Sequence, residues 1–441
     1  MRFHRRRASA VILFGAALIF SPAEARAQVA SAPTESPLIT ALRKATGSPN
    51  PSAVDQFWKT VASRKTPLID TVSNDPNHVL ATFVFQGGTD AKDVVLVAGP
   101  NGIAPFEDPR SHMRHLAGTD VWYVSDRVAA DAEFFYQFSV NPPAADNGVP
   151  SAGALRSTLF PDPFNPLQYP EADDPMAASG HGSIARMLAV PQNPWLAKRA
   201  DVAAGTVTSD TVAGSRIGGA RRVWTYASPG ASLRDANILI MFDGGIYINR
   251  IHTPVILDNL YAAHKIGPTV AVFVDNAGAA RSSDYYFSDS YNAFLAEELL
   301  PWVERKFGVK ATPVRTVLGG SSLGGLAAAY AVLRRPDLFG KALSQSGAFW
   351  PNGRSKDDPE PEWLARQFAQ APKSDAFFYM EVGSHESTMA LETTLLASNR
   401  HLRDILQLKG YRYRYAEIPG DHEPVHWRRG LPDGLIATLA P

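Results

Sequence analysis

A serine set between glycines is the feature of this chain that points most directly to chemistry. Gly320-Ser321-Ser322-Leu323-Gly324 forms a G-x-S-x-G pattern, with an apolar run before it and an alanine-rich run after it. Glycines in this pattern let a strand turn sharply into a helix, because a Cβ there would strike neighbouring backbone. The five residues alone also fit an ordinary tight turn. With these flanks they predict Ser322 as a nucleophile and the Leu323 N–H as an oxyanion donor.

A serine nucleophile needs a base within hydrogen-bond reach. The histidines that follow Ser322 are His385, His401, His422 and His426. His422 lies in a loop directly after the strand-like run YRYRYAEI, whereas His401 lies in a helical pattern. We therefore predict that His422 is the catalytic base.

A base of this kind is usually oriented by an acid, and two glutamates compete for that role. Glu386 lies just beyond the strand-like run AFFYMEVG, where a side chain can turn toward an imidazole, and Glu381 lies within the run. We predict Glu386 as the acid. Glu381 and a serine–histidine dyad without an acid remain open alternatives.

The turn after the apolar run ILIMFDG provides a second source of oxyanion donors. Its glycines allow backbone N–H groups to approach a tetrahedral oxygen closely, with Gly245 favoured and Gly244 next, while Asp243 fixes the turn.

Arginines and aromatic residues fall on loops at the same predicted edge of the sheet. Guanidinium groups pair with anions and stack on rings, so these loops predict a pocket for an anionic aromatic substrate. The predicted substrate-binding residues are Arg281, Trp350, Arg354, Trp427 and Arg428.

The elements that position these residues divide the chain into two domains. The second half alternates near-continuous apolar strands with helical patterns over 290–307, 323–334, 361–370 and 388–410, which indicates a mostly parallel sheet flanked by helices. The first half contains short alternating runs separated by turn residues, which indicate an antiparallel β-sandwich. The predicted fold is an α/β hydrolase preceded by a β-sandwich. Its predicted parts are a signal peptide (1–27), a β-sandwich domain (28–172), a linker (173–204) and a catalytic domain (205–441).

The N-terminus has the pattern of a secretory signal peptide. Four arginines within the first seven residues precede a short apolar run and an Ala25-Arg26-Ala27 cleavage motif. The run is too short to span a bilayer, so we predict cleavage after Ala27 or Ala25, a periplasmic or secreted protein, and no membrane association after cleavage. The absence of cysteine suits an oxidising compartment.

The bulk composition excludes several functional classes. The chain has 441 residues, 45% of them hydrophobic, and a formal net charge of zero, so nothing indicates nucleic-acid binding. No H-E-x-x-H motif, EF-hand loop or cysteine pair is present, and no G-x-G-x-x-G loop follows a strand. We expect no metal and no cofactor, and a small-molecule ester as the binding partner.

Taken together, these stretches make the chain resemble the enterochelin (ferric enterobactin) esterase family, within the esterase D-like branch of α/β-hydrolases. The resemblance covers nearly all of the predicted mature chain and rests on stretches 115–122, 132–138, 161–166, 319–325, 343–347, 381–386, 420–423 and 426–431. It implies that Ser322 and His422 are nucleophile and base and that Glu386 is the acid. It also implies that the substrate is a catecholate siderophore trilactone, free or as its ferric complex, whose serine esters are hydrolysed.

Two stretches depart from the family pattern. Residues 281–285 keep an arginine but lack the Glu-Leu of the usual R-x-x-E-L run, and the usual Gly-Gly-His is Gly420-Asp421-His422. The first departure borders the predicted pocket and therefore affects the choice of substrate. Two alternative functions follow: a feruloyl or acetyl carbohydrate esterase or an acyltransferase of the same fold, and a periplasmic binding protein that has kept a hydrolase shell without turnover.

Overall fold

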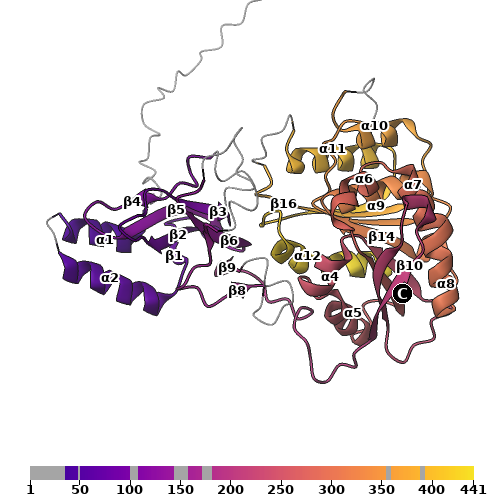
Figure 1. Cartoon of the computed structure of the whole chain (residues 1–441), viewed down its shortest axis with the longest axis horizontal. Helices are drawn as coiled ribbons and strands as arrows, with labels where there is room; N and C mark the ends of the chain where they lie inside the picture. Colours follow the sequence, from indigo (N-terminus) through magenta and orange to yellow (C-terminus); the bar gives the residue numbers. More distant parts are fainter. Residues whose placement is uncertain are drawn as a thin grey trace, which may run out of the picture.

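The computed structural model describes residues 35–47, 50–99, 108–143, 157–170, 181–353, 359–387 and 393–441. These residues form two domains, an antiparallel β domain and a larger α/β domain (Figure 1). This arrangement confirms the predicted fold class. The predicted signal peptide lies outside the described residues. Within the described ranges, no helix is both long enough and apolar enough to cross a membrane.

Two sheets build the β domain, and their facing side chains form its core. One sheet has the order β1-β2-β5-β4, and the other has the order β3-β6-β9-β8 with β7 paired to β6. Phe83, Phe134, Tyr136 and Phe138 are fully buried between them. The strands are β1 (Leu68–Thr71), β2 (His78–Gln86), β3 (Val94–Ala98), β4 (Arg114–His115), β5 (Val121–Ala129), β6 (Glu133–Val140), β7 (Leu159–Phe160), β8 (Gln168–Tyr169) and β9 (Gly182–Arg186).

Two amphipathic helices, α1 (Pro37–Ala45) and α2 (Pro51–Arg64), cover the first sheet. Each begins with a proline after a capping residue, Ser36 or Asn50, whose side chain accepts a backbone N–H. Their apolar faces bury Leu42 and Trp58 against side chains of β2 and β5. The helices therefore cover a sheet face that would otherwise be open to water.

An eight-stranded sheet forms the centre of the α/β domain, in the order β10-β11-β13-β12-β14-β15-β16-β17. The five neighbouring pairs from β13 to β17 are parallel, whereas β10 and β11 pair antiparallel at one edge. The alternation of strands and helices expected in this half is present, and β10 is a polar edge strand. The strands are β10 (Thr206–Val212), β11 (Arg221–Ala227), β12 (Asn237–Met241), β13 (Thr269–Val274), β14 (Thr316–Ser321), β15 (Lys341–Gln345), β16 (Phe377–Gly383) and β17 (Arg412–Ile418).

Helices cover both faces of this sheet (Figure 1). Alternate residues of each strand enter two separate cores, as expected when side chains point to opposite faces. One face carries α4 (Gly244–Asn249), α5 (Thr253–Ala262) and α12 (Pro424–Leu439). The other carries α6 (Arg281–Tyr285), α7 (Asp289–Ala293), the π-helical segment η6 (Phe294–Leu299), α8 (Leu300–Phe307), α9 (Leu323–Arg334), α10 (Trp363–Gln370) and α11 (Leu395–Leu408).

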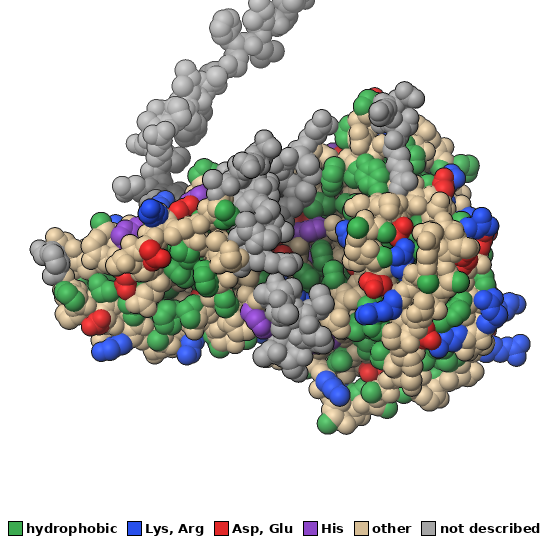
Figure 2. All heavy atoms as spheres, in the orientation of Figure 1, with side chains coloured by type: hydrophobic (Ala, Val, Ile, Leu, Met, Phe, Trp, Pro, Cys, Tyr) green, Lys and Arg blue, Asp and Glu red, His purple; other side chains and the backbone are tan. Residues whose placement is uncertain are grey.

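The two domains meet at the loops that follow the parallel strands. The Glu133 N–H donates to the Pro419 carbonyl at 3.3 Å, and Arg429 of α12 donates to the Asp131 carbonyl at 2.7 Å. Figure 2 shows histidine and hydrophobic side chains in the hollow between the domains.

The segment predicted as a linker contains β9, which pairs with β6, so the β domain extends to about residue 186.

Candidate active site

The turn between β14 and α9 places Ser322 at a strand end. Ser322 has φ +56° and ψ −122°, which is unusual for a residue with a Cβ and is the strained geometry expected of a nucleophile on a strand-to-helix turn. A Cβ on Gly320 would lie only 2.8 Å from the Gly324 carbonyl carbon, so this position requires glycine. The Ser322 N–H donates to Gln345 at 3.0 Å, and its carbonyl accepts from Ala348 at 3.0 Å. The backbone of the turn is therefore fixed to the next strand.

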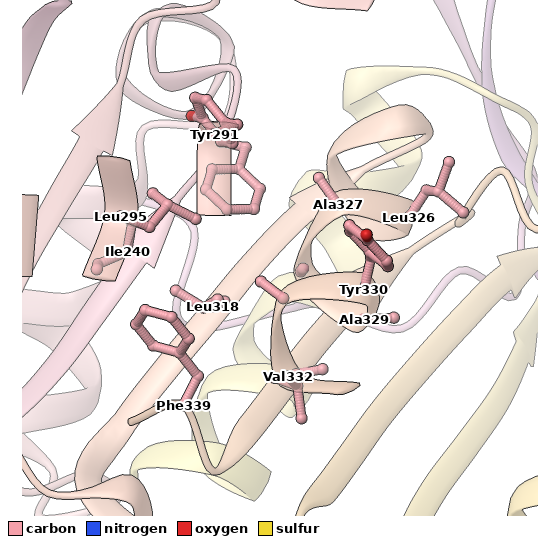
Figure 3. Packing of buried hydrophobic residues seen from close by; sticks show 14 of the residues in the cluster. Ile240, Tyr291, Leu295, Leu318, Leu326, Ala327, Ala329, Tyr330, Val332 and Phe339 are labelled. Carbon is pink, nitrogen blue, oxygen red and sulfur yellow. The ribbon is translucent and has the colours of Figure 1, made fainter. Parts of the chain in front are cut away.

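Tight packing of α9 holds this turn on the sheet. Leu318 of β14 and Leu326, Ala329 and Val332 of α9 belong to one buried cluster (Figure 3). The small alanines let the helix lie close to the strand. The position of Ser322 is therefore fixed by close packing of α9 on β14. The predicted helix 323–334 has the same bounds as α9.

His422 and Glu386 lie close together, after the ends of the neighbouring strands β17 and β16. His422 Nδ1 lies 2.9 Å from Glu386 Oε2, and the Glu386 side chain is fully buried. Glu386 Oε1 also accepts the Gly383 N–H at 2.9 Å and the Ser346 hydroxyl at 2.5 Å. These contacts orient the carboxylate toward the imidazole. They fit the arrangement in which an acid holds a histidine with its proton on Nδ1.

Opposing effects set the protonation of this pair. Burial raises the pKa of the Glu386 carboxyl, but the hydrogen bond and charge of His422 outweigh burial and hold the pKa below its usual value. Burial lowers the pKa of His422, but the bond to Glu386 and its negative charge outweigh burial and hold the pKa above its usual value. The pair therefore favours the imidazolium–carboxylate state that forms when the histidine takes a proton.

This electrostatic balance predicts the pH dependence of the reaction. A general base must be neutral, so we expect kcat/KM for a neutral ester to fall as the pH drops through the pKa of His422. Because that pKa is raised, the acidic limb should lie above the ordinary histidine value of about 6.5. Initial rates between pH 5 and 9 on an uncharged ester test this. A limb below that value would mean that Glu386 does not stabilise the imidazolium.

The segments that carry Ser322 and His422 are linked through the residues that follow β15. Among the described residues, the His422 side chain hydrogen-bonds Glu386, and the partly exposed Ser322 hydroxyl hydrogen-bonds no protein group. Ser346 bonds Glu386, and Ser346 is two residues from Ala348, which bonds Ser322. Catalytic hydrogen bonds are often long before substrate binds. The roles of Ser322 as nucleophile and His422 as base therefore stay predictions.

Backbone N–H groups for an oxyanion come from two turns. Among the described residues, the N–H groups of Leu323, Gly244 and Gly245 donate to no protein acceptor. Asp243 adopts a left-handed conformation, φ +54° and ψ +44°, and starts α4 at Gly244. A Cβ on Gly244 would lie 2.5 Å from the Phe273 carbonyl carbon, so the turn can approach β13 only with glycine there. These N–H groups are available to a substrate oxygen.

Comparisons with known proteins match both domains. A family model described as putative esterase matches residues 214–438, and a model described as enterochelin esterase, N-terminal, matches residues 80–196. The chain belongs to the enterochelin esterase family. It is a carboxylic ester hydrolase.

Relatives and solved structures extend this match over most of the chain. The iron(III) enterobactin esterase of Dickeya dadantii is 28% identical and covers 86% of this esterase and 92% of the relative. The iron(III) salmochelin esterase of Escherichia coli is 23% identical, with coverage of 90% and 96%. The crystal structure of ferric enterobactin esterase from Salmonella typhimurium has a TM-score of 0.69 at 21% identity, with coverage of 87% and 98%. The last similarity shows a shared fold.

In this esterase, Arg281 faces an internal carboxylate. Its guanidinium binds Asp243 through two bonds, of 2.7 and 2.8 Å, and Asn276 donates to the same carboxylate. Asp243 also lies 3.3 Å from the place where a Cβ on Gly324 would be. Arg281 therefore ties the turn that carries Gly244 and Gly245 to the start of α6, and the same turn lies against the start of α9. The prediction that Arg281 binds substrate stays a prediction, and its observed contact indicates a second role.

A substitution separates these two roles of Arg281. If Arg281 fixes the oxyanion turn, Arg281→Gln should lower kcat about tenfold for neutral and anionic esters alike, because a bidentate charged contact is lost. If it binds an anionic substrate, KM should rise for anionic esters and stay constant for neutral ones. Steady-state kinetics on one ester of each charge distinguish the outcomes. Arg403→Gln is the matched control, because it removes a partly buried arginine of α11 that pairs with Asp404.

Glu381 belongs to a buried network that links β15, β16 and the start of α12. It accepts bonds from Gln345 at 2.6 Å and Tyr379 at 2.8 Å, and Gln345 also accepts the Tyr247 hydroxyl. Burial raises the pKa of Glu381 to about 8. Of the two glutamates considered for the acid, Glu386 is the one that contacts His422. Glu381 instead holds β15 and β16 together.

The remaining predicted substrate-binding residues have different surroundings. Trp350 is partly exposed on the loop after β15, and Arg354 lies outside the described residues. Trp427 is buried and its ring lies 5.2 Å from that of His422, edge to face. Arg428 donates to the Leu196 carbonyl and lines a cavity of about 640 Å³ between the domains. Trp350 is thus partly exposed, as are Arg281 and Arg428, and binding by all five stays a prediction.

Ser346 is a site residue that the sequence did not reveal. It follows β15 directly, in the run KALSQSG, and its hydroxyl contacts the acid. The sequence could have indicated this role, because Ser346 follows a central parallel strand and ligand sites in such sheets lie at the carboxyl ends of the strands.

No group of three or more potential metal ligands occurs among the residues that the structure describes.

Proposed function

We propose that this protein is a serine esterase that hydrolyses the ester bonds of a catecholate siderophore of the enterobactin type. The observation that carries the proposal is the buried Glu386–His422 pair, 2.9 Å apart, at the same sheet edge as the strained Ser322 turn. The relatives named as enterobactin and salmochelin esterases, which share both domains, support the substrate class.

The proposed reaction has two halves. Ser322 Oγ attacks the ester carbonyl carbon while His422 Nε2 takes the hydroxyl proton, and the N–H groups of Leu323 and Gly245 stabilise the oxyanion. The tetrahedral intermediate collapses to an acyl-enzyme, and the imidazolium gives its proton to the departing alcohol. Water, deprotonated by His422, then attacks the acyl-enzyme and releases the carboxylic acid. Glu386 stabilises the imidazolium in both halves and stays ionised.

The chemistry of the substrate fits the surroundings of the site. A trilactone of three acylated serines carries three equivalent esters, so one nucleophile can open the ring and then cut the linear products. Catecholates are aromatic and, when bound to Fe(III), anionic, which suits arginine and tryptophan side chains on the surrounding loops. Here Fe(III) enters as part of the substrate.

Hydrolysis of defined esters tests the proposal. The purified mature protein should convert the cyclic trilactone, with or without Fe(III), to linear trimer, dimer and monomer, followed by chromatography. Feruloylated arabinose and acetylated xylose are the comparison substrates. A kcat/KM at least about tenfold higher for the trilactone supports the proposal. Preference for the feruloyl or acetyl ester would replace it with the carbohydrate esterase alternative, and binding without turnover would favour a binding protein.

We also propose that the protein is exported, on the basis of the basic, apolar and Ala-x-Ala segments of residues 1–27. Expression of the full chain in a Gram-negative host, followed by fractionation and N-terminal sequencing, tests this. The expected product is periplasmic or secreted and begins at Gln28 or Arg26. A cytosolic product that retains residues 1–27 would contradict export.

A further inference from the structure

The end of β15 holds a second serine beside the catalytic acid. Ser346 is fully buried, and like Ser322 it has a positive φ, +50°. Its N–H donates to the Glu381 carbonyl at 2.7 Å, and its hydroxyl lies 2.5 Å from Glu386 Oε1. A non-glycine residue in this backbone region costs energy that surrounding contacts must offset. The conformation therefore places the hydroxyl where the acid needs a donor.

The direction of the Ser346 hydroxyl proton follows from its other neighbour. Trp427 Nε1 lies 3.0 Å from Ser346 Oγ, and an indole nitrogen can only donate. Ser346 Oγ therefore accepts from Trp427 and has its own proton free to donate to Glu386. A hydroxyl that donates to a carboxyl group stabilises its charged form more than its neutral form, so the contact favours ionised Glu386.

Trp427 touches the base as well as Ser346. Its ring lies 5.2 Å from the His422 ring at an interplanar angle of 85°. The Trp427 carbonyl accepts the Gln345 side chain at 2.8 Å, which fixes the first turns of α12 against β15. One tryptophan thus restrains the imidazole by packing and the carboxylate through Ser346.

We propose that Ser346 and Trp427 are positioning residues that hold Glu386 and His422 in the reactive arrangement. Each Glu386 oxygen then has a defined partner: Oε1 accepts from Ser346 and Gly383, and Oε2 accepts from His422. With Oε1 held, Oε2 cannot rotate away from Nδ1, and His422 Nε2 stays free to accept the Ser322 proton. This inference rests on the proposed serine mechanism and adds the two residues that keep its acid in place.

Single substitutions of the two residues should lower turnover. Ser346→Ala removes one donor from a buried carboxylate, so we expect kcat to fall about 10- to 100-fold with KM unchanged. Trp427→Phe keeps the ring and removes the donor, so we expect a fall of about three- to tenfold. Ser346→Thr keeps the hydroxyl but places a β-branched side chain at a buried position with positive φ, so it should restore the activity only in part. Ser344→Ala is the matched control, because Ser344 is a buried serine of β15, two residues before Ser346, whose hydroxyl has no hydrogen-bond partner among the described residues.

A double-mutant cycle distinguishes positioning of the acid from general support of the fold. If Ser346 acts through Glu386, Ser346→Ala should cause almost no further loss in a Glu386→Ala background. The Nδ1–H proton resonance of His422 should shift in Ser346→Ala and be unchanged in Ser344→Ala. Wild-type kcat in Ser346→Ala, or an equal loss with and without Glu386, would overturn the inference. An active Ser322→Ala variant would instead overturn the serine mechanism itself.

Discussion

Ser322→Ala should lower kcat about a millionfold while the protein stays folded. Nucleophile and base act as a unit, so removing either one eliminates nearly the whole covalent route and leaves only binding and the oxyanion donors. The substitution removes one partly exposed oxygen that hydrogen-bonds no described protein group, so no structural contact is lost. Alanine also keeps the Cβ that the turn already accommodates at φ +56°.

Three measurements check this expectation. Single-turnover kinetics on an activated ester give the rate, circular dichroism and thermal unfolding give the fold, and a fluorophosphonate followed by peptide mapping gives the labelled serine. Ser321→Ala is the matched control, because it removes the adjacent hydroxyl, which is buried rather than directed to substrate. Label on any serine other than Ser322, or substantial activity in Ser322→Ala, would falsify the assignment.

The sequence was informative wherever local pattern and fold agree. The bounds of α9 and the central strands β12 to β16 of the α/β domain follow from apolar runs that are buried on both faces. Glycine spacing around Ser322 reflects a close approach between Gly320 and Gly324, which no other residue permits. Such features depend on residues that are close in the sequence, so they can be predicted from a single sequence.

Features built from distant residues were harder to predict. β10 is polar and mostly exposed because it is an edge strand, so it lacks the apolar pattern of its neighbours. β9 lies among prolines and glycines and is a strand because β6 pairs with it. Arg281 was expected to face substrate, but its carboxylate partner Asp243 comes from another turn that is close only in three dimensions. Ser346 gains its role from Glu386 and Trp427 in the same way.

Glu386→Ala should lower kcat about ten-thousandfold, less than the loss of Ser322, because the acid supports the base and does not react. The variant leaves His422 without its acceptor and removes the charge that raises its pKa, so the acidic limb of kcat/KM should move to lower pH. Steady-state kinetics from pH 5 to 9 measure both effects.

Glu381→Gln is the informative comparison for the same measurement. Burial raises the pKa of Glu381 to about 8, so at pH 7 the side chain is mostly a neutral acid, which glutamine resembles in shape and charge. Glu381 contacts Gln345 and Tyr379 and not His422, so its loss should change stability more than turnover. If Glu381→Gln reduced kcat more than Glu386→Ala, the acid would be Glu381, and the contact between Glu386 and His422 would be structural. If neither variant changed kcat, Ser322 and His422 would work as a dyad, because the buried carboxylate beside the imidazole would then contribute nothing to the transition state.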